Sequence, residues 1–300
     1  MPRTRATAIL PLVGCLLLVS LAGCGGGAAQ PPPAEAAGGF TIQNKGSDTL
    51  VNLALAWAER YTALHPEVRI AVTGGGSGTG IAALINGTVH IANASRKIKP
   101  EEVQQARANG IEPVEHVVAA DAIAIVVHPH NPVDRLTIPQ LSAIFSGKIT
   151  NWKEVGGEDR PIVTLSRETN SGTHVFFLEE VVRQGRKDDK TLFSPETLLM
   201  PSSEGISSEI RRNPNAIGYD GLGYVTPDQK VIAVARDERG PYILPSIETV
   251  HNGTYPIARD LYMYTAGEPT GIIKEYLDWI RTPEAQAIVA ELGFVPIIKP

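Results

Sequence analysis

Apolar residues recur at strand-like and helix-like spacing in turn through the first part of the chain. From Thr49 to Leu64 they fall at helical positions, and Val68 to Thr73 has the length and β-branched content of a strand. Regular alternation of strands and helices predicts an α/β fold with a mainly parallel sheet covered by helices. The predicted elements here are strands at 41–43, 68–73 and 89–92 and helices at 49–64, 81–85 and 100–108.

A second group of elements follows the nearly continuous apolar run from Ala122 to Val127. That run predicts a buried strand, and Pro129 and Pro132 close it with a turn. We place the first crossing between two lobes near this strand. The later elements are a helix at 139–145, a strand at 162–166, helices at 173–182 and 205–211, a strand and turn at 216–225, a strand at 231–235, a returning strand at 255–264, and helices at 272–281 and 283–292.

The N-terminus has the pattern of an export signal. Arg3 and Arg5 precede an apolar stretch, residues 9–22, that is too short and too interrupted to span a membrane as a stable helix. The sequence Leu21-Ala22-Gly23-Cys24 resembles the lipobox of bacterial lipoproteins. We therefore expect a signal peptide at 1–23 and a lipid on Cys24. The alternative is that Cys24 is an ordinary residue of a cleaved secretory signal.

Under this interpretation the mature chain has no thiol for a disulfide. Cys15 lies in the peptide to be removed and Cys24 carries the lipid, so the body depends on its core alone. Residues 24–39 are mainly Gly, Ala and Pro, which predicts a tether. The remaining length suits two lobes. We expect lobe one at 40–118, lobe two at 119–257 and a return to lobe one at 258–300.

Net charge narrows the classes of partner. The formal charge of −5 becomes −7 when Arg3 and Arg5 leave with the signal peptide. An acidic body argues against nucleic acid, whereas a small anion can still bind, because local donors decide binding inside a closed cleft. No second stretch of eighteen apolar residues occurs in the sequence. We expect a lipid-anchored monomer, periplasmic or otherwise extracytoplasmic.

Three turns rich in serine and glycine lead directly into predicted helices, at Gly46–Thr49, Gly76–Gly80 and Asn170–Thr173. The first amides of a helix have no partner within it, and the helix dipole adds positive potential there. Three such ends together would hold an anion. Taken alone, the turn at 76–80 also fits a loose dinucleotide fingerprint or a plain tight turn, although no lysine follows it as in a P-loop.

Arg167 stands four residues before Ser171 at the third of these turns. Its guanidinium offers paired donors that match a tetrahedral oxyanion, while Ser171 and Thr173 add hydroxyl groups at the helix start. The alternative is an N-capped helix with a solvated arginine upstream.

The turns also carry a resemblance to a known family. Four segments resemble the ligand loops of the PstS family, the phosphate-binding proteins of bacterial phosphate ABC importers: Lys45–Leu50, Thr73–Gly80, Ile91–Arg96 and Arg167–Thr173, with further matches at Leu141–Trp152 and Ala216–Tyr219. The resemblance runs from about Phe40 to the C-terminus. It implies a two-lobed periplasmic binding protein fold of type II with inorganic phosphate in the inter-lobe cleft. It also implies delivery of that phosphate to an ABC permease with its ATPase subunits.

Carried over by position, the resemblance implies a set of ligand contacts: Ser47, Thr49, the Leu50 amide, Ser77, Arg167, Ser171, Gly172 and Thr173. One position departs. Where other members have an aspartate that accepts the proton of hydrogen phosphate, this chain has Ser95, followed by Arg96. Asp48 is our candidate for the acceptor, and Arg96 for a second cation. The alternative for Asp48 is a cap on the helix that starts near Thr49.

Signals for an enzyme are weak. The sequence has no HExxH or GxSxG motif and no cysteine nucleophile in the mature chain. His128 and His130 indicate a turn after a buried strand rather than metal ligands, and His174 indicates a partly buried helix residue. We expect no catalysis, cofactor or metal. The alternatives to phosphate transport are a binding protein for sulfate or molybdate and, from another class, a secreted phosphatase.

Overall fold

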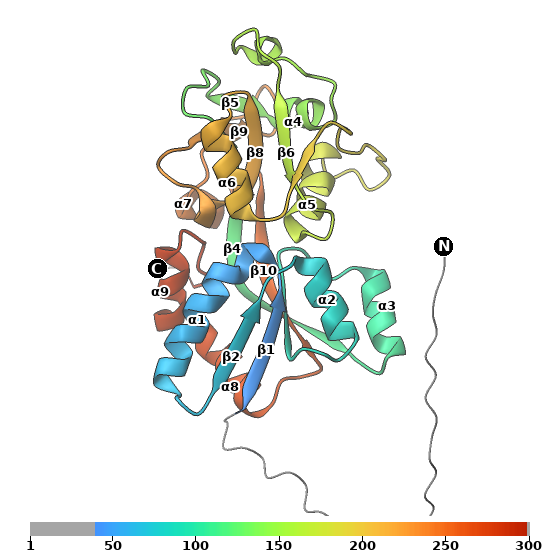
Figure 1. Cartoon of the computed structure of the whole chain (residues 1–300), viewed down its shortest axis with the longest axis vertical. Helices are drawn as coiled ribbons and strands as arrows, with labels where there is room; N and C mark the ends of the chain where they lie inside the picture. Colours follow the sequence, from blue (N-terminus) through green and yellow to red (C-terminus); the bar gives the residue numbers. More distant parts are fainter. Residues whose placement is uncertain (1–39, 299–300) are drawn as a thin grey trace, which may run out of the picture. The chain divides into compact units, whose positions relative to one another are not determined.

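A computed structural model describes residues 40–298 of the protein. The predicted signal peptide (1–23), the lipidation site Cys24 and the tether (24–39) lie outside the described residues. Figure 1 shows two halves joined by strands β4 (Pro113–Val127) and β10 (Ala258–Ala266). Below, the lower half is the one built on β1 to β3, and the upper half is the one built on β5 to β9.

The lower half contains five strands in the order β2-β1-β3-β10-β4. β1 (Thr41–Gly46) pairs in parallel with β2 (Arg69–Thr73) and β3 (Ile91–Ala94), and β10 is antiparallel to β3 and β4. Its helices are α1 (Val51–Leu64), α2 (Ser77–Ile85), α3 (Pro100–Ala108), α8 (Gly271–Ile280) and α9 (Pro283–Glu291). Because parallel strands end at the same edge of a sheet, the turns after β1, β2 and β3 lie together.

The upper half contains its own strands and core. β8 (Ala216–Gly221) lies between β4 and β6 (Val163–Arg167), and β7 (Leu198–Met200) pairs with the other edge of β6. β5 (Arg135–Thr137) pairs with β9 (Lys230–Ala235). The helices are α4 (Ile138–Phe145), α5 (Gly172–Phe177), α6 (Ser203–Arg212) and α7 (Ile247–His251). The Phe177 and Tyr219 rings stack in the core with centroids 3.7 Å apart. Four short turns complete the fold: η1 (Asp48–Leu50), η2 (Trp152–Val155), η3 (Leu178–Val182) and η4 (Leu222–Tyr224).

Strand β4 runs through both halves. Residues 113–122 pair with β10, and residues 123–127 pair with β8 and β9. The sequence predicted only the last six residues of this strand, because Glu115, His116 and Asp121 interrupt the apolar run upstream. All of β4 from Ala122 to Val127 is buried, as that run predicted.

The alternation of strands and helices predicted for the first part of the chain is confirmed. The helix predicted at 205–211 is α6, two residues longer at its start and one at its end. The single helix predicted at 173–182 is instead an α-helix to Phe177 followed by the π-helical turn η3. The short strands β5 and β7 and the five-residue helix α7 were not predicted.

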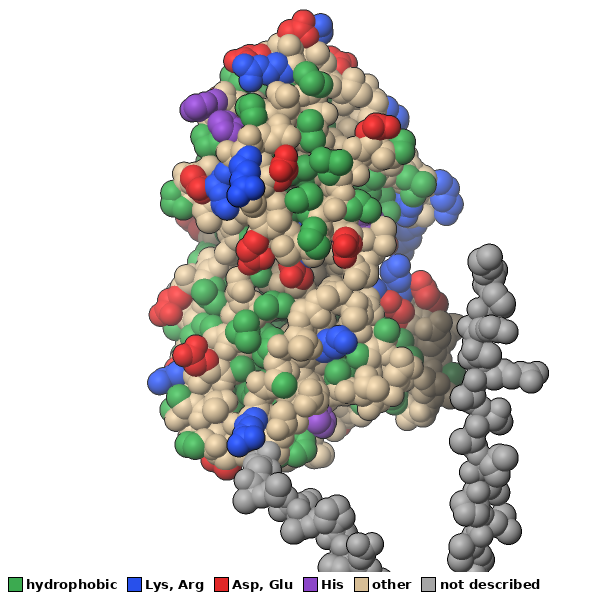
Figure 2. Space-filling model, in the orientation of Figure 1, with side chains coloured by type: hydrophobic (Ala, Val, Ile, Leu, Met, Phe, Trp, Pro, Cys, Tyr) green, Lys and Arg blue, Asp and Glu red, His purple; other side chains and the backbone are tan. Residues whose placement is uncertain are grey.

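The surface agrees with the acidic composition. Lys, Arg, Asp and Glu side chains are mixed over both halves of the face in Figure 2, without a continuous basic area. Within residues 40–298, no helix has the length and apolar content needed to cross a membrane.

Candidate functional site

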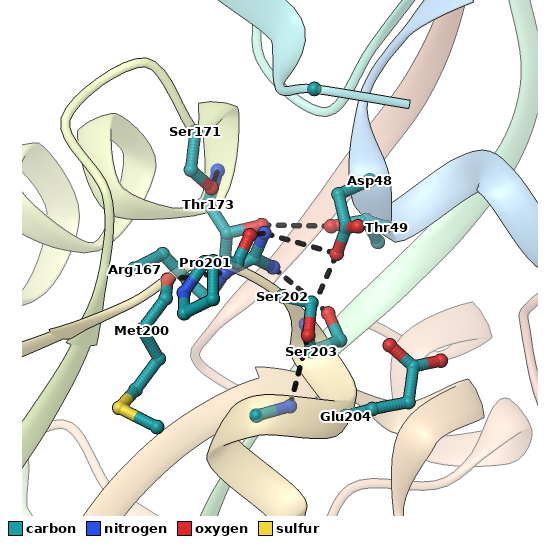
Figure 3. A network of polar contacts seen from close by, with 12 residues as sticks. Asp48, Thr49, Arg167, Ser171, Thr173, Met200, Pro201, Ser202, Ser203 and Glu204 are labelled. Atoms are coloured by element: carbon teal, nitrogen blue, oxygen red, sulfur yellow. Dashed lines mark hydrogen bonds and ion pairs between the residues drawn. The ribbon is translucent and has the colours of Figure 1, made fainter. Parts of the chain in front are cut away.

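The three predicted turns converge where the two halves meet. The Thr49 hydroxyl at η1 lies 2.9 Å from the Thr173 hydroxyl at the start of α5, as drawn in Figure 3. The Gly78 amide at the start of α2 donates to the Asn170 carbonyl (3.0 Å). Residues from η1, α2 and α5 therefore line one site, and the first two belong to the lower half and the third to the upper half.

Gly172 allows the closest approach between these turns. A Cβ atom at this position would lie 2.3 Å from the Ser77 hydroxyl oxygen and 2.6 Å from that of Ser95. Real Cβ atoms do not approach oxygen so closely, so the backbone of α5 can meet α2 only because residue 172 has no side chain. Ser77 and Ser95 are themselves linked, since the Ser95 amide donates to the Ser77 hydroxyl (3.0 Å).

At the start of α5, part of the predicted donor set is used within the helix. The Ser171 hydroxyl oxygen accepts from the amides of Thr173 (3.2 Å) and His174 (3.4 Å), which is an N-cap. Ser171 and Thr173 are nevertheless buried at the site, and the Ser171 hydroxyl hydrogen has no acceptor among the residues that the structure describes. That hydroxyl hydrogen is the donor that the cap leaves for a ligand.

The turn after β1 also combines used and free groups. The Leu50 amide donates to the Ser47 carbonyl (3.2 Å), so this predicted ligand donor has a local partner. The Ser47 hydroxyl is buried and has no hydrogen-bond partner within residues 40–298. A free hydroxyl beside Thr49 fits the predicted role of this turn.

Arg167 ends strand β6 with its side chain only 2% exposed. One guanidinium nitrogen, Nη1, donates to the Ser203 hydroxyl (2.9 Å), and Nη2 lies 3.0 Å from the Asp48 carboxylate. Backbone carbonyls of Met200 and Pro201 accept from Nε and Nη2. Figure 3 shows the contacts of the guanidinium with Asp48 and Ser203. The solvated-arginine alternative is therefore wrong, because this cation is enclosed at the site.

Asp48 does not cap its own helix. Its carboxylate accepts from the Ser203 amide (3.0 Å) at the start of α6 and pairs with Arg167, both in the upper half. Neither η1 nor α1 has a side-chain cap. The Asp48 carboxylate thus links the two halves, with the cation on one side and a helix N-terminus on the other.

Arg96, predicted as a second cation of the site, is held by the lower half. Both of its terminal nitrogens donate to Glu102 on α3 (2.8 and 2.7 Å), and Nη1 also donates to the Lys97 carbonyl. Burial acts to raise the pKa of Glu102, but the hydrogen bonds from Arg96 and from the Lys99 amide together lower it below the usual value. In this bidentate ion pair the carboxylate of Glu102 on α3 balances the charge of Arg96.

Two further charged groups at the site were not found from the sequence. Arg259 on β10 pairs with Asp121 on β4 and donates to the Thr173 hydroxyl (2.9 Å). Asp220 is the penultimate residue of β8, and one of its carboxylate oxygens, Oδ2, is buried and unpartnered among the described residues. Burial raises the pKa of Asp220 to about 7, although the charge of Arg167 opposes the shift. No local motif marks these residues, because strand pairing alone brings them here.

The histidines have structural surroundings. His128 and His130 form a turn, with the His130 amide 3.2 Å from the His128 Nδ1. His174 is buried in α5 and lies 3.0 Å from the Ser166 hydroxyl, as expected of a helix residue. Within residues 40–298, no group of three or more His, Cys, Asp or Glu side chains could hold a metal ion.

Comparison with known proteins agrees with this geometry. Residues 31–284 match the PBP superfamily domain. The phosphate-binding protein PstS of Pseudomonas aeruginosa is 33% identical over 85% of this chain and 83% of its own length, and PstS of Bacillus subtilis is 34% identical over 88% and 82%.

Solved structures show the same architecture. A substrate-binding protein from Clostridium perfringens, solved with bound phosphate, superposes with a TM-score of 0.77 at 33% identity, covering 86% of this chain and 100% of its own. A phosphate transport receptor from Vibrio cholerae gives a TM-score of 0.68 at 30% identity, covering 85% and 99%. These similarities confirm the predicted α/β periplasmic binding protein fold. With relatives at this level of identity over most of its length, the chain belongs to the PstS family of phosphate-binding proteins.

Proposed function

We propose that this protein captures inorganic phosphate outside the cytoplasmic membrane and delivers it to an ABC permease with its ATPase subunits. The observation that carries the proposal is the convergence of three turns at helix starts, with the enclosed guanidinium of Arg167 paired to Asp48 of the first turn. Amides and hydroxyls at helix starts bind anions, and a forked guanidinium matches a tetrahedral oxyanion. The protein makes and breaks no bond.

In this proposal the ligand lies between two lobes, formed by residues 40–118 with 258–300 and by residues 119–257. Lobe one provides Ser47, Thr49, the Leu50 amide, Ser77 and Ser95, and lobe two provides Arg167, Ser171, Gly172 and Thr173. Closure brings the two sets together and excludes water, which strengthens each charge-assisted hydrogen bond. The hydroxyl contact between Thr49 and Thr173 supports this closed arrangement.

Asp48 is the proposed acceptor for the proton of hydrogen phosphate. Its carboxylate is next to Arg167 in the site and comes from the same turn as Thr49. A carboxylate accepts hydrogen bonds and repels a fully ionised anion such as sulfate, whereas a serine hydroxyl at position 95 does not repel it. Arg96 is left with a minor role, because Glu102 holds its charge.

Calorimetric titration of the purified body with phosphate, sulfate and molybdate tests the function. We expect saturable binding of phosphate and much weaker binding of sulfate and molybdate. Preference for sulfate or molybdate would mean that phosphate is the wrong ligand, whereas the fold and the location of the site would stand. Incubation with a chromogenic phosphoester is the matched test for the phosphatase alternative, and the proposal requires no release of the chromophore.

The lipid anchor on Cys24 is a separate proposal and depends on the lipobox-like sequence. A lipid attached there would hold the protein at the membrane after removal of residues 1–23. Cys24→Ala should release the protein in soluble form or leave it unprocessed, as judged by fractionation and by mass spectrometry of the N-terminus. Firm membrane retention of a processed Cys24→Ala variant contradicts the anchor without affecting phosphate binding.

A further inference from the structure

Arg259 lies at the centre of the junction between the two halves. It is opposite Asp121 in the antiparallel pairing of β10 with β4, the two strands that connect the halves. Both side chains are buried, Arg259 with 7% of its surface exposed and Asp121 with none. The Arg259 guanidinium and the Asp121 carboxylate are 3.0 Å apart.

The guanidinium of Arg259 contacts both halves of the anion site. On the lower side, Nη1 donates to the Ser95 carbonyl (2.9 Å) and Nη2 lies 3.5 Å from the Thr49 hydroxyl. On the upper side, Nη2 donates to the Thr173 hydroxyl (2.9 Å), and the guanidinium lies 5.4 Å from the centre of the Phe176 ring. The same cation therefore contacts the two hydroxyls, on Thr49 and Thr173, that meet across the site.

The ion pair with Asp121 fixes this cation in place. Asp121 also accepts from the Leu222 amide (3.0 Å), so its carboxylate has a second anchor on the upper half. The Nε–H of Arg259 is buried without a hydrogen-bond partner among residues 40–298. A buried ion pair gives little net stability over apolar residues of the same volume. Its position at the anion site therefore suggests a role in binding.

We propose that Arg259 is the second cation of the anion site and a positioning residue that holds Thr49 and Thr173 together around a doubly charged ligand. Arginine keeps its proton at any physiological pH, so this positive charge is permanent. The inference rests on the proposed function, because it requires an anion at this site. It assigns to Arg259 the second positive charge that the sequence predicted at Arg96.

Calorimetry with inorganic phosphate on Arg259→Gln and Arg259→Lys tests the role of charge. At about pH 8.5, where the ligand carries two charges, we expect Arg259→Gln to weaken binding by about 10- to 100-fold. At about pH 5, where it carries one, the loss should be several-fold smaller, since attraction scales with ligand charge. Arg259→Lys should recover part of the affinity at the higher pH. Arg107→Gln, which removes an arginine from the exposed ion pair with Glu112 in the lower half, is the matched control and should stay within about threefold of the parent.

Removal of one partner of a buried pair can unfold the protein, so the double variant Arg259→Gln/Asp121→Asn provides the decisive measurement. Glutamine and asparagine keep hydrogen-bonding groups without charge. We expect a thermal midpoint close to that of the parent, together with a loss of phosphate affinity that is again larger at the higher pH but smaller than in Arg259→Gln, because no unpaired Asp121 carboxylate remains beside the anion. Affinity within twofold of the parent at both pH values, or an equal loss at both, overturns the inference. Failure of the parent itself to bind phosphate would instead refute the proposed function.

Discussion

Two arginines follow strands that end at the site, and each forms an ion pair of a different kind. Arg167 ends β6 in the upper half, and its carboxylate partner Asp48 belongs to the lower half. Arg96 follows β3 in the lower half, and its partner Glu102 lies six residues along the same half. The first pair can form only when the halves meet, whereas the second can form in the lower half alone.

Only the Arg167 ion pair depends on the contact between the two halves. The Asp48 carboxylate pairs with Arg167 and accepts a hydrogen bond from the first turn of α6, so it joins the lower half to the upper half. Glu102 accepts two hydrogen bonds from Arg96 and one from the Lys99 amide, so it stabilises the start of α3. An ion pair that crosses between the halves stabilises their contact, whereas a local pair contributes only to the stability of its own half.

Arg167→Ala should have the largest effect on this comparison. The substitution removes charge-assisted hydrogen bonds in an enclosed site and leaves the Asp48 carboxylate without its cation. We expect the phosphate affinity to fall by up to about a thousandfold. Calorimetry measures the change, and the thermal midpoint shows whether the variant is folded. A folded variant with parental affinity would place the site away from Arg167.

Asp220→Asn tests the effect of pH on the surroundings of Arg167. A second buried carboxyl, that of Asp220, lies near Arg167. Burial raises the folded pKa of Asp220 from 3.8 to about 7. The folded state therefore binds more protons than the unfolded state between about pH 4 and 7, and this group's contribution to stability is full below pH 4 and is lost as pH rises through 7. Arg167, Ser203 and Asp121 all act on this carboxyl.

Asparagine cannot ionise and should not show that loss. Relative to the parent, Asp220→Asn should gain about 2 to 4 kcal/mol in the free energy of unfolding between about pH 4 and pH 8.5. Urea denaturation of both proteins at the two pH values gives the difference and cancels the titration of all other groups. An equal difference at the two pH values would mean that Asp220 titrates alike in the folded and unfolded states, so that burial does not raise its pKa.

The contrast between the two arginines could be predicted only in part from the sequence. Local signals were sufficient for the turns, since Ser77, Ser171 and Gly172 stand beside glycine-rich helix starts. Proximity in sequence also suggested that Arg96, next to Ser95, would reach the ligand. That expectation stays a prediction, and in the structure the Arg96 guanidinium is hydrogen-bonded to Glu102, the third residue of α3.

Residues placed by strand pairing could not be predicted. Arg259 reaches Thr173 because β10 returns antiparallel to β4 with Arg259 opposite Asp121, a register that the sequence alone does not fix. Asp220 lies within β8, opposite Ala124 of β4, and has no motif around it. The long first part of β4 was missed for a related reason. Its charged residues interrupt the apolar run, although pairing with β10 continues through them.

Gly172→Ala tests the close approach of the α5 backbone in the upper half to Ser77 and Ser95 in the lower half. Gly172 is five residues after Arg167, and its Cα faces Ser77 and Ser95, the latter adjacent to Arg96. A methyl group there would require α5 and the Ser77 and Ser95 side chains to move apart by about 1 Å and would weaken phosphate binding by about 10- to 100-fold. Gly205→Ala on α6 is the matched control, because its added Cβ would meet no atom closer than 3.4 Å. Equal affinities for the two variants would contradict the close approach.

Asp48→Asn neutralises the carboxylate partner of Arg167. Asparagine at position 48 can still accept from the Ser203 amide, but it loses the ion pair with Arg167 and no longer repels sulfate. We expect phosphate binding to weaken by about three- to tenfold and the preference over sulfate to narrow. Competition titration measures both. If Asp48→Asn keeps its phosphate affinity and its rejection of sulfate, Asp48 is not the acceptor, and selectivity must come from Ser95.

Arg96→Gln should have the smallest effect on binding, because Glu102 and the lower half already hold that guanidinium. We expect the phosphate affinity to stay within about threefold of the parent, while the free energy of unfolding falls by about 1 to 3 kcal/mol since Glu102 is left without its partner. The double variant Arg96→Gln/Glu102→Gln should recover most of that stability, because no unpaired charge remains at the start of α3. A tenfold or greater loss of phosphate affinity in the double variant, at parental stability, would mean that the charge of Arg96 reaches the anion. The distinction between a pair that crosses the halves and a local pair would then fail.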